Sequence, residues 1–239
     1  MTKTVFITGG SRGIGACAVE EFSRRGYNVA FTYLNSKENA ENLAKKTGAC
    51  PILCDVSNSS DVNKAIELAT STFGKIDILI NNAGIGEFAL FTDITDEMWH
   101  KMLNTNLSSA FYASRAVLPQ MISRKDGVII NISSMWGQVG ASYEVHYSAS
   151  KAGLIGLTKA LAKEVGLSGI RVNCICPGVI DTDMNNALSD EDINLLKYDT
   201  PLHRIGQCED VVKSLIFLSE DSSSFITGQI LGVNGGFII

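Results

Sequence analysis

The sequence predicts an α/β fold, in which a doubly wound parallel sheet of about seven strands carries helices on both faces. Two observations support this prediction. Short apolar runs alternate with longer amphipathic stretches, and the runs are apolar on both faces, as expected for parallel strands that are covered on two sides. The runs are residues 4–8, 28–33, 51–54, 76–81, 128–132, 171–176 and 230–233.

The amphipathic stretches between these runs predict the crossover helices. Residues 14–25, 61–73 and 145–166 are the clearest, and in the first of them Ile14 and Ala18 recur at helical spacing. The sequence shows no internal repeat, low-complexity tract or linker, and its 4 prolines are scattered. We therefore expect residues 1–239 to form a single domain, which is within the usual size of one α/β domain.

Composition excludes several classes of protein. The 239 residues carry 20 basic and 25 acidic side chains, a net charge of −5, which argues against a nucleic-acid-binding protein. With 45% hydrophobic and 19% charged residues the chain is not disordered, and it holds no apolar stretch long enough to span a membrane. No secretory signal is visible, and the 6 cysteines form no C-x-x-C pair. We therefore expect a cytoplasmic protein with buried thiols and no metal site.

A glycine-rich turn follows the first apolar run and precedes a predicted helix. Such a turn lets the backbone approach a pyrophosphate, and the helix N-terminus adds N–H donors and a positive dipole. The spacing is G-x-x-x-G-x-G, so the motif alone is weak, and its place between a strand and a helix makes it a candidate for nucleotide binding. The predicted contacts are Gly9, Ser11, Arg12, Gly13, Ile14 and Gly15.

The end of the second run favours NADP over NAD as the cofactor. Enzymes that bind NAD usually place an acidic residue here for the ribose hydroxyls, and such an acid would repel a 2′-phosphate. In this chain Asn35 and Ser36 follow the run, and no acid occurs before Glu38. Arg12 can supply a bidentate cation to the phosphate, with hydrogen bonds from Asn35 and Ser36; the alternative is that Arg12 is simply solvated.

The third and fourth runs end in further cofactor candidates, because ligands bind beyond the carboxyl ends of the strands. Asp55 and Val56 follow the third run, where Asp55 either accepts a hydrogen bond from an adenine amino group or begins a turn. Asn82, Ala83 and Gly84 follow the fourth run, and small and amide residues there suit close contact with a cofactor.

Tyr147 and Lys151 form the candidate catalytic pair. They are four residues apart in a predicted helix and share one face, and Ser134 lies at the carboxyl end of the preceding run. Tyr33 and Lys37 have the same spacing but no hydroxyl residue at the matching position upstream. A lysine ammonium about 4 Å from the phenol is expected to lower the pKa of Tyr147 from about 10 to about 7. Ser134 then polarises a substrate carbonyl, while the cofactor supplies the hydride.

Together these motifs resemble the short-chain dehydrogenase/reductase family over essentially the whole chain. The resemblance implies a Rossmann fold and a catalytic tetrad of Asn106, Ser134, Tyr147 and Lys151. In this tetrad Asn106 holds a water that relays a proton from Lys151, and Lys151, next to Tyr147, also holds the nicotinamide ribose. The segment after the sixth run is implied to lie along the nicotinamide, through Pro177, Gly178, Ile180 and Thr182.

Within the family, the chain is most similar to the 3-oxoacyl-[acyl-carrier-protein] reductases of fatty acid synthesis. Residues 106–109, 151–156, 178–184 and 226–228 carry this similarity. Those enzymes dock an acidic carrier protein through two basic residues that flank the site. Lys125 matches one of them, but the other position is Ser168, which weakens the prediction of a carrier-bound substrate.

The active-site loop fits a second branch of the family better. Residues 132–137 and 140–145 resemble reductases that act on the 5-aminopentanone modification of elongation factor P, in which Trp136 shapes the substrate side. A substrate that bears an amine would favour an acid such as Glu144, although Glu144 also fits a solvated charge at a helix start. Another small ketone or a steroid stays open as the substrate.

The resemblance further implies that two helices, near residues 111–118 and 154–161, form a dimer face in a homotetramer or homodimer. Residues 181–199 are acidic and irregular, with a helical pattern near 190–197, and we expect a lid there. A nucleotide-sugar epimerase would need a further substrate domain, and a regulator that only senses NADP would be expected to lack Tyr147 or Lys151. We therefore expect a NADPH-dependent carbonyl reductase.

Overall fold

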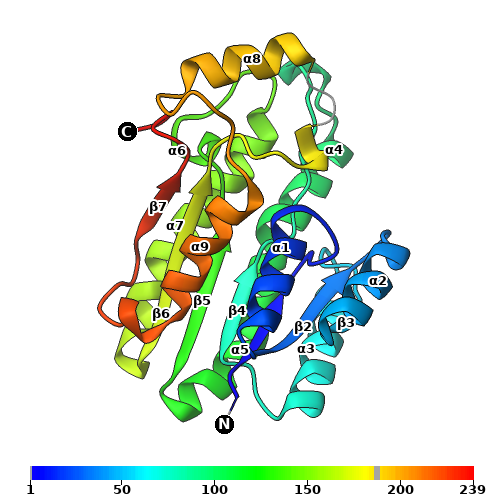
Figure 1. The fold of residues 1–239 in the computed structure, drawn as a ribbon, viewed down its shortest axis with the longest axis vertical. Helices are drawn as coiled ribbons and strands as arrows, with labels where there is room; N and C mark the ends of the chain where they lie inside the picture. Colours follow the sequence, from blue (N-terminus) through cyan, green and yellow to red (C-terminus); the bar gives the residue numbers. More distant parts are fainter. Residues whose placement is uncertain (1, 186–188) are drawn as a thin grey trace.

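A seven-stranded parallel sheet forms the centre of the protein (Figure 1). The computed structural model describes residues 2–185 and 189–239. Its strand order is β3-β2-β1-β4-β5-β6-β7, and every pairing between neighbouring strands is parallel. The strands are β1 Thr4–Ile7, β2 Asn28–Tyr33, β3 Cys50–Leu53, β4 Ile78–Asn81, β5 Gly127–Ile132, β6 Ile170–Pro177 and β7 Ile230–Val233. Each of the predicted runs overlaps one of these strands, to within two residues at either end, so the predicted fold class is confirmed.

Helices cover both faces of the sheet. The α-helices are α1 Gly13–Arg24, α2 Lys37–Thr47, α3 Ser59–Phe73, α4 Asp96–Leu103, α5 Ser109–Arg124, α6 Trp136–Val139, α7 Val145–Val165, α8 Asp190–Asp199 and α9 Cys208–Ser219. A π-helix, η2 Asn104–Ser108, joins α4 to α5. No helix in the described part of the chain combines the length and the apolar character that crossing a lipid bilayer requires.

Two hydrophobic cores hold these layers together. Successive strand side chains point to opposite faces, so Val5 and Ile7 join one core and Phe6 joins the other. The first core contains side chains of α1, α2 and α9, and the second contains side chains of α3, α5 and α7. This arrangement explains why the strands are apolar on both faces.

The order of the strands fixes where a ligand can bind. From β1 the chain builds the sheet outward through β2 and β3 on one side, and then returns to add β4 to β7 on the other. In a doubly wound sheet the crevice at this reversal, beyond the carboxyl ends of β1 and β4, is the expected ligand site. The glycine-rich turn and residues 82–84 both lie at this crevice.

Helix α8 begins within the segment predicted as a lid. Ser189 Oγ accepts a hydrogen bond from the Asp192 backbone N–H at 3.2 Å, and the Asp192 carboxylate accepts one from the Ser189 N–H at 3.0 Å. This capping box starts the helix where the sequence pattern predicts one. Residues 186–188 of the predicted lid lie outside the described residues.

Candidate active site

The glycine-rich turn packs closely against the loop after β4, at the carboxyl end of β1. Gly9 has a φ of +66°, and a Cβ atom there would lie 2.9 Å from the Cα atom of Ala83. A Cβ atom on Gly15 would lie 2.6 Å from Nδ2 of Asn82 and would also overlap the carbonyl oxygen of Gly9. Glycine is therefore required at both positions, and α1 starts at Gly13, directly after this closely packed turn.

Buried hydroxyl groups hold this turn in place. Thr32 Oγ1 accepts a hydrogen bond from the Gly9 N–H at 3.0 Å, and Thr8 Oγ1 accepts one from the Asn82 N–H at 3.0 Å. The Asn82 amide donates to the carbonyl oxygen of Gly9 at 2.9 Å. Asn82 therefore supports the turn through its own amide. The supporting roles of Thr8 and Thr32 were not predicted from the sequence. The signal that could have indicated them is a hydroxyl residue inside a buried strand or directly after one.

The residues predicted for the 2′-phosphate lie at the same edge. Arg12 is exposed at the position before α1, with an extended backbone, and Asn35 is exposed just before α2. Asp55 Oδ1 accepts hydrogen bonds from the Ser57 N–H at 2.9 Å and the Ser57 hydroxyl at 2.7 Å. This carboxylate oxygen therefore begins a turn, which is one of the two alternatives for Asp55.

The segment after β6 reaches across to the glycine-rich turn. Pro177 ends β6 in a buried position, and the Gly178 N–H donates to the carbonyl oxygen of Val233 at 3.0 Å. A Cβ atom on Gly13 would touch the methyl group of Thr182 at 3.4 Å. Ile180 is buried beside them. The structure therefore brings the predicted nicotinamide-side segment next to the start of α1.

Ser134, Tyr147 and Lys151 come together at the carboxyl end of β5, and all three are buried. Lys151 Nζ lies 5.6 Å from the centre of the Tyr147 ring and donates a hydrogen bond to the carbonyl oxygen of Ile132 at 2.9 Å. The Ser134 hydroxyl faces the Tyr147 phenol and acts to lower the pKa of that phenol as a hydrogen-bond donor. The Trp136 N–H donates to Ser134 Oγ at 3.1 Å. This arrangement holds a serine hydroxyl and a phenol side by side at the carboxyl end of β5.

Asn106 joins this cluster from η2. Its Oδ1 accepts from the Ile85 N–H at 2.8 Å, and its Nδ2 donates to the Ile85 carbonyl oxygen at 2.9 Å and to Ser150 Oγ at 3.1 Å. A Cβ atom on Gly84 would lie 3.3 Å from both Asn106 Oδ1 and Lys151 Nζ. Asn106 therefore ties the loop after β4 to α7, and π-helices of this kind are frequent at functional sites.

Burial controls the protonation of the catalytic pair. It raises the pKa of Tyr147 to about 12, against the opposing effect of the hydrogen bond from Ser134, and it lowers the pKa of Lys151 to about 8. The expectation that the pKa of Tyr147 lies near 7 is therefore wrong for this chain on its own. The physical reason is that Lys151 directs its ammonium group to Ile132, while the phenol loses its hydration.

Glu144 lies at the rim of this cluster, three residues before Tyr147. It is only partly exposed, and burial raises the pKa of its carboxyl group to about 7. Its negative charge contributes to the raised pKa of Tyr147, so the carboxylate and the phenol are close enough to interact electrostatically. Glu144 is therefore more than a solvated charge at the start of α7.

Two positions predicted to flank the site do not lie beside it. Lys125 ends α5, and a Cβ atom on Gly169 would overlap its carbonyl oxygen, so Lys125 and Ser168 are neighbours at the amino-terminal edge of the sheet. Ser134 follows the opposite end of β5, which at about 3.3 Å per residue lies well over 10 Å away. Within one chain these positions cannot flank Ser134.

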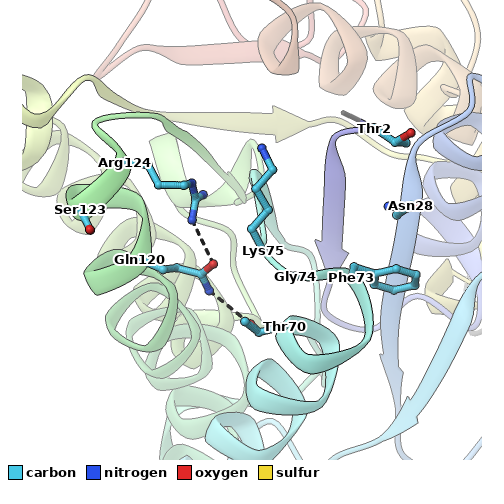
Figure 2. A pocket seen from close by; sticks show the side chains of 9 residues that line it. All are labelled: Thr2, Asn28, Thr70, Phe73, Gly74, Lys75, Gln120, Ser123 and Arg124. Carbon is cyan, nitrogen blue, oxygen red and sulfur yellow. Dashed lines mark hydrogen bonds between the residues drawn. The ribbon is translucent and has the colours of Figure 1, made fainter.

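A surface cavity of about 640 Å³ also lies at the amino-terminal edge (Figure 2). Figure 2 shows Gln120 between Arg124 and Thr70, to both of which it is hydrogen-bonded. Lys75 Nζ lies 2.7 Å from the buried Asp77 carboxylate. These groups join α3, β4 and α5, and the cavity is separate from the glycine-rich turn and the Tyr147 cluster.

Comparisons with known proteins agree with this geometry. A family model described as enoyl-(acyl carrier protein) reductase matches residues 9–238. The 3-oxoacyl-[acyl-carrier-protein] reductase FabG of Chlamydia trachomatis serovar D is 42% identical over 241 residues, which cover 99% of this chain and 97% of the relative. The proteins of the same name from Staphylococcus aureus strain Mu50 and Staphylococcus epidermidis strain RP62A are 41% and 39% identical, again over 99% of this chain and over 98% and 99% of the relatives. With such similarity over nearly its full length, the chain belongs to the short-chain dehydrogenase/reductase family, whose members are oxidoreductases that use a nicotinamide cofactor.

Proposed function

We propose that residues 1–239 act as one NADPH-dependent reductase domain whose substrate is a 3-oxoacyl thioester on an acyl carrier protein. One observation supports the proposal most strongly. Ser134 and Tyr147 lie next to the ammonium group of Lys151, which is bound to a backbone carbonyl, and all three lie at the same edge of the sheet as the glycine-rich turn. The names of the curated relatives support the substrate class.

The residues at the crevice fit a dinucleotide. Gly9 and Gly15 let the turn pack directly against Ala83 and Asn82, and the start of α1 behind this turn offers backbone N–H groups to a pyrophosphate. When bound, the cofactor supplies a hydride to the substrate carbonyl carbon. The residues proposed to hold it are Gly9, Ser11, Arg12, Gly13, Ile14, Gly15, Asn35, Ser36, Asp55, Val56, Asn82, Ala83, Gly84, Tyr147, Lys151, Pro177, Gly178, Ile180 and Thr182.

Tyr147 gives its phenolic proton to the carbonyl oxygen. Its raised pKa keeps the proton on the phenol at neutral pH, which is the form that reduction needs. The carbonyl oxygen gains negative charge during reduction and becomes the stronger base, while the ammonium of Lys151 stabilises the phenolate that remains. The proton relay assigned to Asn106 belongs to this proposal, in which the amide bonds to Ile85 and Ser150 hold the relay residue in position.

Ser134 orients the carbonyl group. The Trp136 N–H donates to Ser134 Oγ and fixes the position of this oxygen. The single serine hydroxyl proton faces Tyr147 when no substrate is bound, and it turns to donate to the substrate oxygen when the carbonyl group enters. This is a single-donor version of an oxyanion hole, which is worth several kcal/mol in enzymes that use one.

The test follows absorbance of the reduced cofactor with purified protein and acetoacetyl thioester. We expect turnover with NADPH, much slower turnover with NADH, and a loss of about 10²–10⁴-fold in Tyr147→Phe without loss of cofactor binding. Full activity of Tyr147→Phe would refute the assigned proton donor. If the protein binds NADPH tightly but does not reduce the thioester, the proposed substrate class is wrong, while the proposal of a reductase site is unaffected.

Glu144 favours a second candidate substrate, a ketone that carries an amine, such as the 5-aminopentanone modification on elongation factor P. Its partly buried carboxyl group lies within electrostatic reach of Tyr147 and has no cationic partner among the described residues. A substrate ammonium would restore the charged form of this group. An amino ketone that turns over faster than acetoacetyl thioester, and loses that advantage in Glu144→Gln, would establish this candidate.

We also propose that α5 and α7 form a face between copies in a homotetramer or homodimer. Phe111 of α5 is 44% exposed, and the Arg115 guanidinium lies 4.8 Å from its ring centre. Light scattering of the purified protein tests this assembly, and a monomer at micromolar concentration would refute it.

A further inference from the structure

The C-terminal strap, which we define as residues 234–239, connects three parts of the candidate active site. Figure 1 shows the C-terminus at the same end of the molecule as α6 and α8. The Phe237 ring lies edge-on to the Trp136 indole, with 5.6 Å between ring centres and 90° between their planes. Trp136 is also the residue whose N–H donates to Ser134 Oγ.

The strap is itself held by specific contacts. Asn234 Oδ1 accepts from the Gly236 N–H at 3.0 Å, and Asn234 Nδ2 donates to the Ile238 carbonyl oxygen at 3.0 Å. Gly235 and Gly236 have φ values of +67° and +89°, which bend the chain sharply after β7. These bonds define the conformation in which Phe237 reaches Trp136.

The same turn packs against the end of α8. The Leu202 N–H donates to the Gly235 carbonyl oxygen at 3.2 Å, and a Cβ atom on Gly235 would lie 2.6 Å from the Thr200 methyl group. A Cβ atom on Gly178 would also meet the Cα atom of Asn234 at 2.8 Å. The strap therefore touches both the residues that directly follow the predicted lid and the segment proposed to line the nicotinamide.

The short helix α6 depends on this support. On its inner side, a Cβ atom on Gly137 would lie 2.8 Å from the backbone of Lys151, so α6 already rests on α7. At its first residue, Trp136, the helix also packs against Phe237. A helix of four residues has little stability of its own, so these contacts help to decide where Trp136 lies. The backbone on either side of Ser134 is held by hydrogen bonds to β6, so Trp136 acts on the orientation of the Ser134 hydroxyl.

We propose that Phe237 is a positioning residue for ketone reduction, which acts through Trp136 to hold the Ser134 hydroxyl in line with the substrate carbonyl. The inference rests on the proposed reductase function and assigns the C-terminal strap to the substrate side of that site. It separates the substrate side, which needs Phe237, from the cofactor side at the ends of β1 and β4.

The experiment compares Phe237→Ala and Phe237→Tyr with Phe225→Ala, a matched loss of a ring that is fully exposed elsewhere on the chain. The substrates are acetoacetyl thioester and a small uncharged diketone, assayed where all variants are folded by circular dichroism. In Phe237→Ala we expect kcat to fall about tenfold, because a displacement of well under 1 Å at Ser134 is costly, while the dissociation constant for NADPH stays unchanged. Phe237→Tyr, which keeps the ring, should restore kcat.

Tryptophan fluorescence supplies a readout that does not depend on turnover. In a Trp99→Phe background Trp136 is the only tryptophan, and Phe237→Ala should shift its emission to longer wavelength as the indole becomes hydrated. A normal kcat in Phe237→Ala would overturn the inference even if the emission shifts, since the strap would then only add stability.

If the wild type reduces the diketone but no thioester, the proposed thioester substrate fails and the diketone data still decide the role of Phe237. If the wild type reduces neither ketone, the reductase proposal fails, and unchanged Trp136 emission would overturn the strap inference separately.

Discussion

Lys151 donates a hydrogen bond from Nζ to the carbonyl oxygen of Ile132, 2.9 Å away, at the last residue of β5. This bond fixes a buried ammonium group beside the Tyr147 ring and directs its charge along the sheet edge. Burial nevertheless lowers the pKa of Lys151 to about 8. The chain therefore keeps this charge at a cost in stability.

That cost gives a prediction for Lys151→Met. Between pH 8 and the ordinary lysine pKa of 10.5 the unfolded chain binds more protons than the folded chain, so wild-type stability rises with pH in this window. Below pH 8 the full cost is present. We expect Lys151→Met to be inactive but more stable than wild type at pH 7, by about 1–3 kcal/mol. Urea denaturation at pH 7 and pH 10 checks this, and a gain that does not shrink at pH 10 would contradict it.

The same group predicts how the reduction rate depends on pH. Tyr147, with its pKa raised to about 12, keeps its proton up to strongly alkaline pH. Lys151 loses its charge near pH 8, and with it the stabilisation of the phenolate. We therefore expect kcat for reduction to fall as the pH rises above about 8. A rate that stays constant to pH 10 would show that the charge of Lys151 does not assist the reaction.

Periodicity predicted the sheet because burial on both faces leaves a signal in each strand. The ends of the strands were predictable for the same reason, and Ser134, Asn82 and Gly84 lie at them. The π-helix around Asn106 was not predictable, because it spans five residues, and the shift that it causes in the apolar pattern cannot be recognised over so short a segment. The pairing of Phe237 with Trp136 joins residues about a hundred positions apart, and only the folded chain reveals it.

The sequence also misjudged the balance of charge and burial at the catalytic pair. Spacing on a helix places Lys151 beside Tyr147, but it contains no information on the direction of the ammonium group. In the structure the Ile132 carbonyl takes that group, and the loss of hydration raises the pKa of Tyr147. By contrast, the sequence was sufficient to place Lys125 and Ser134 apart, because they lie on opposite sides of the predicted run 128–132 and therefore at opposite ends of β5.

Asn106→Leu tests the clamp between the loop after β4 and α7. The substitution removes the amide that bonds both backbone groups of Ile85 and the hydroxyl of Ser150. We expect a loss of about 2 kcal/mol in the free energy of unfolding, because these partners lose their hydrogen bonds in a buried place. Asn104→Ala, an exposed change in the same π-helix, is the control and should cost little. Equal stabilities of the two variants in urea would contradict the assigned role.

Arg12→Ala tests the choice between the two nicotinamide cofactors. Arg12 is exposed at the start of α1, on the side where Asn35 and Ser36 follow β2, and no acid stands there to bind ribose hydroxyls. A bidentate bond to the 2′-phosphate is worth about 1.5–3 kcal/mol, so the dissociation constant for NADPH should rise about 10–100-fold while that for NADH stays the same. Because the pair is exposed, the NADPH affinity of wild type should also weaken with salt more steeply than that of the variant. Lys45→Ala, which removes an exposed cation from α2, controls for net charge. If both affinities fall equally in Arg12→Ala, the side chain contributes to the fold of the glycine-rich turn and does not recognise the phosphate.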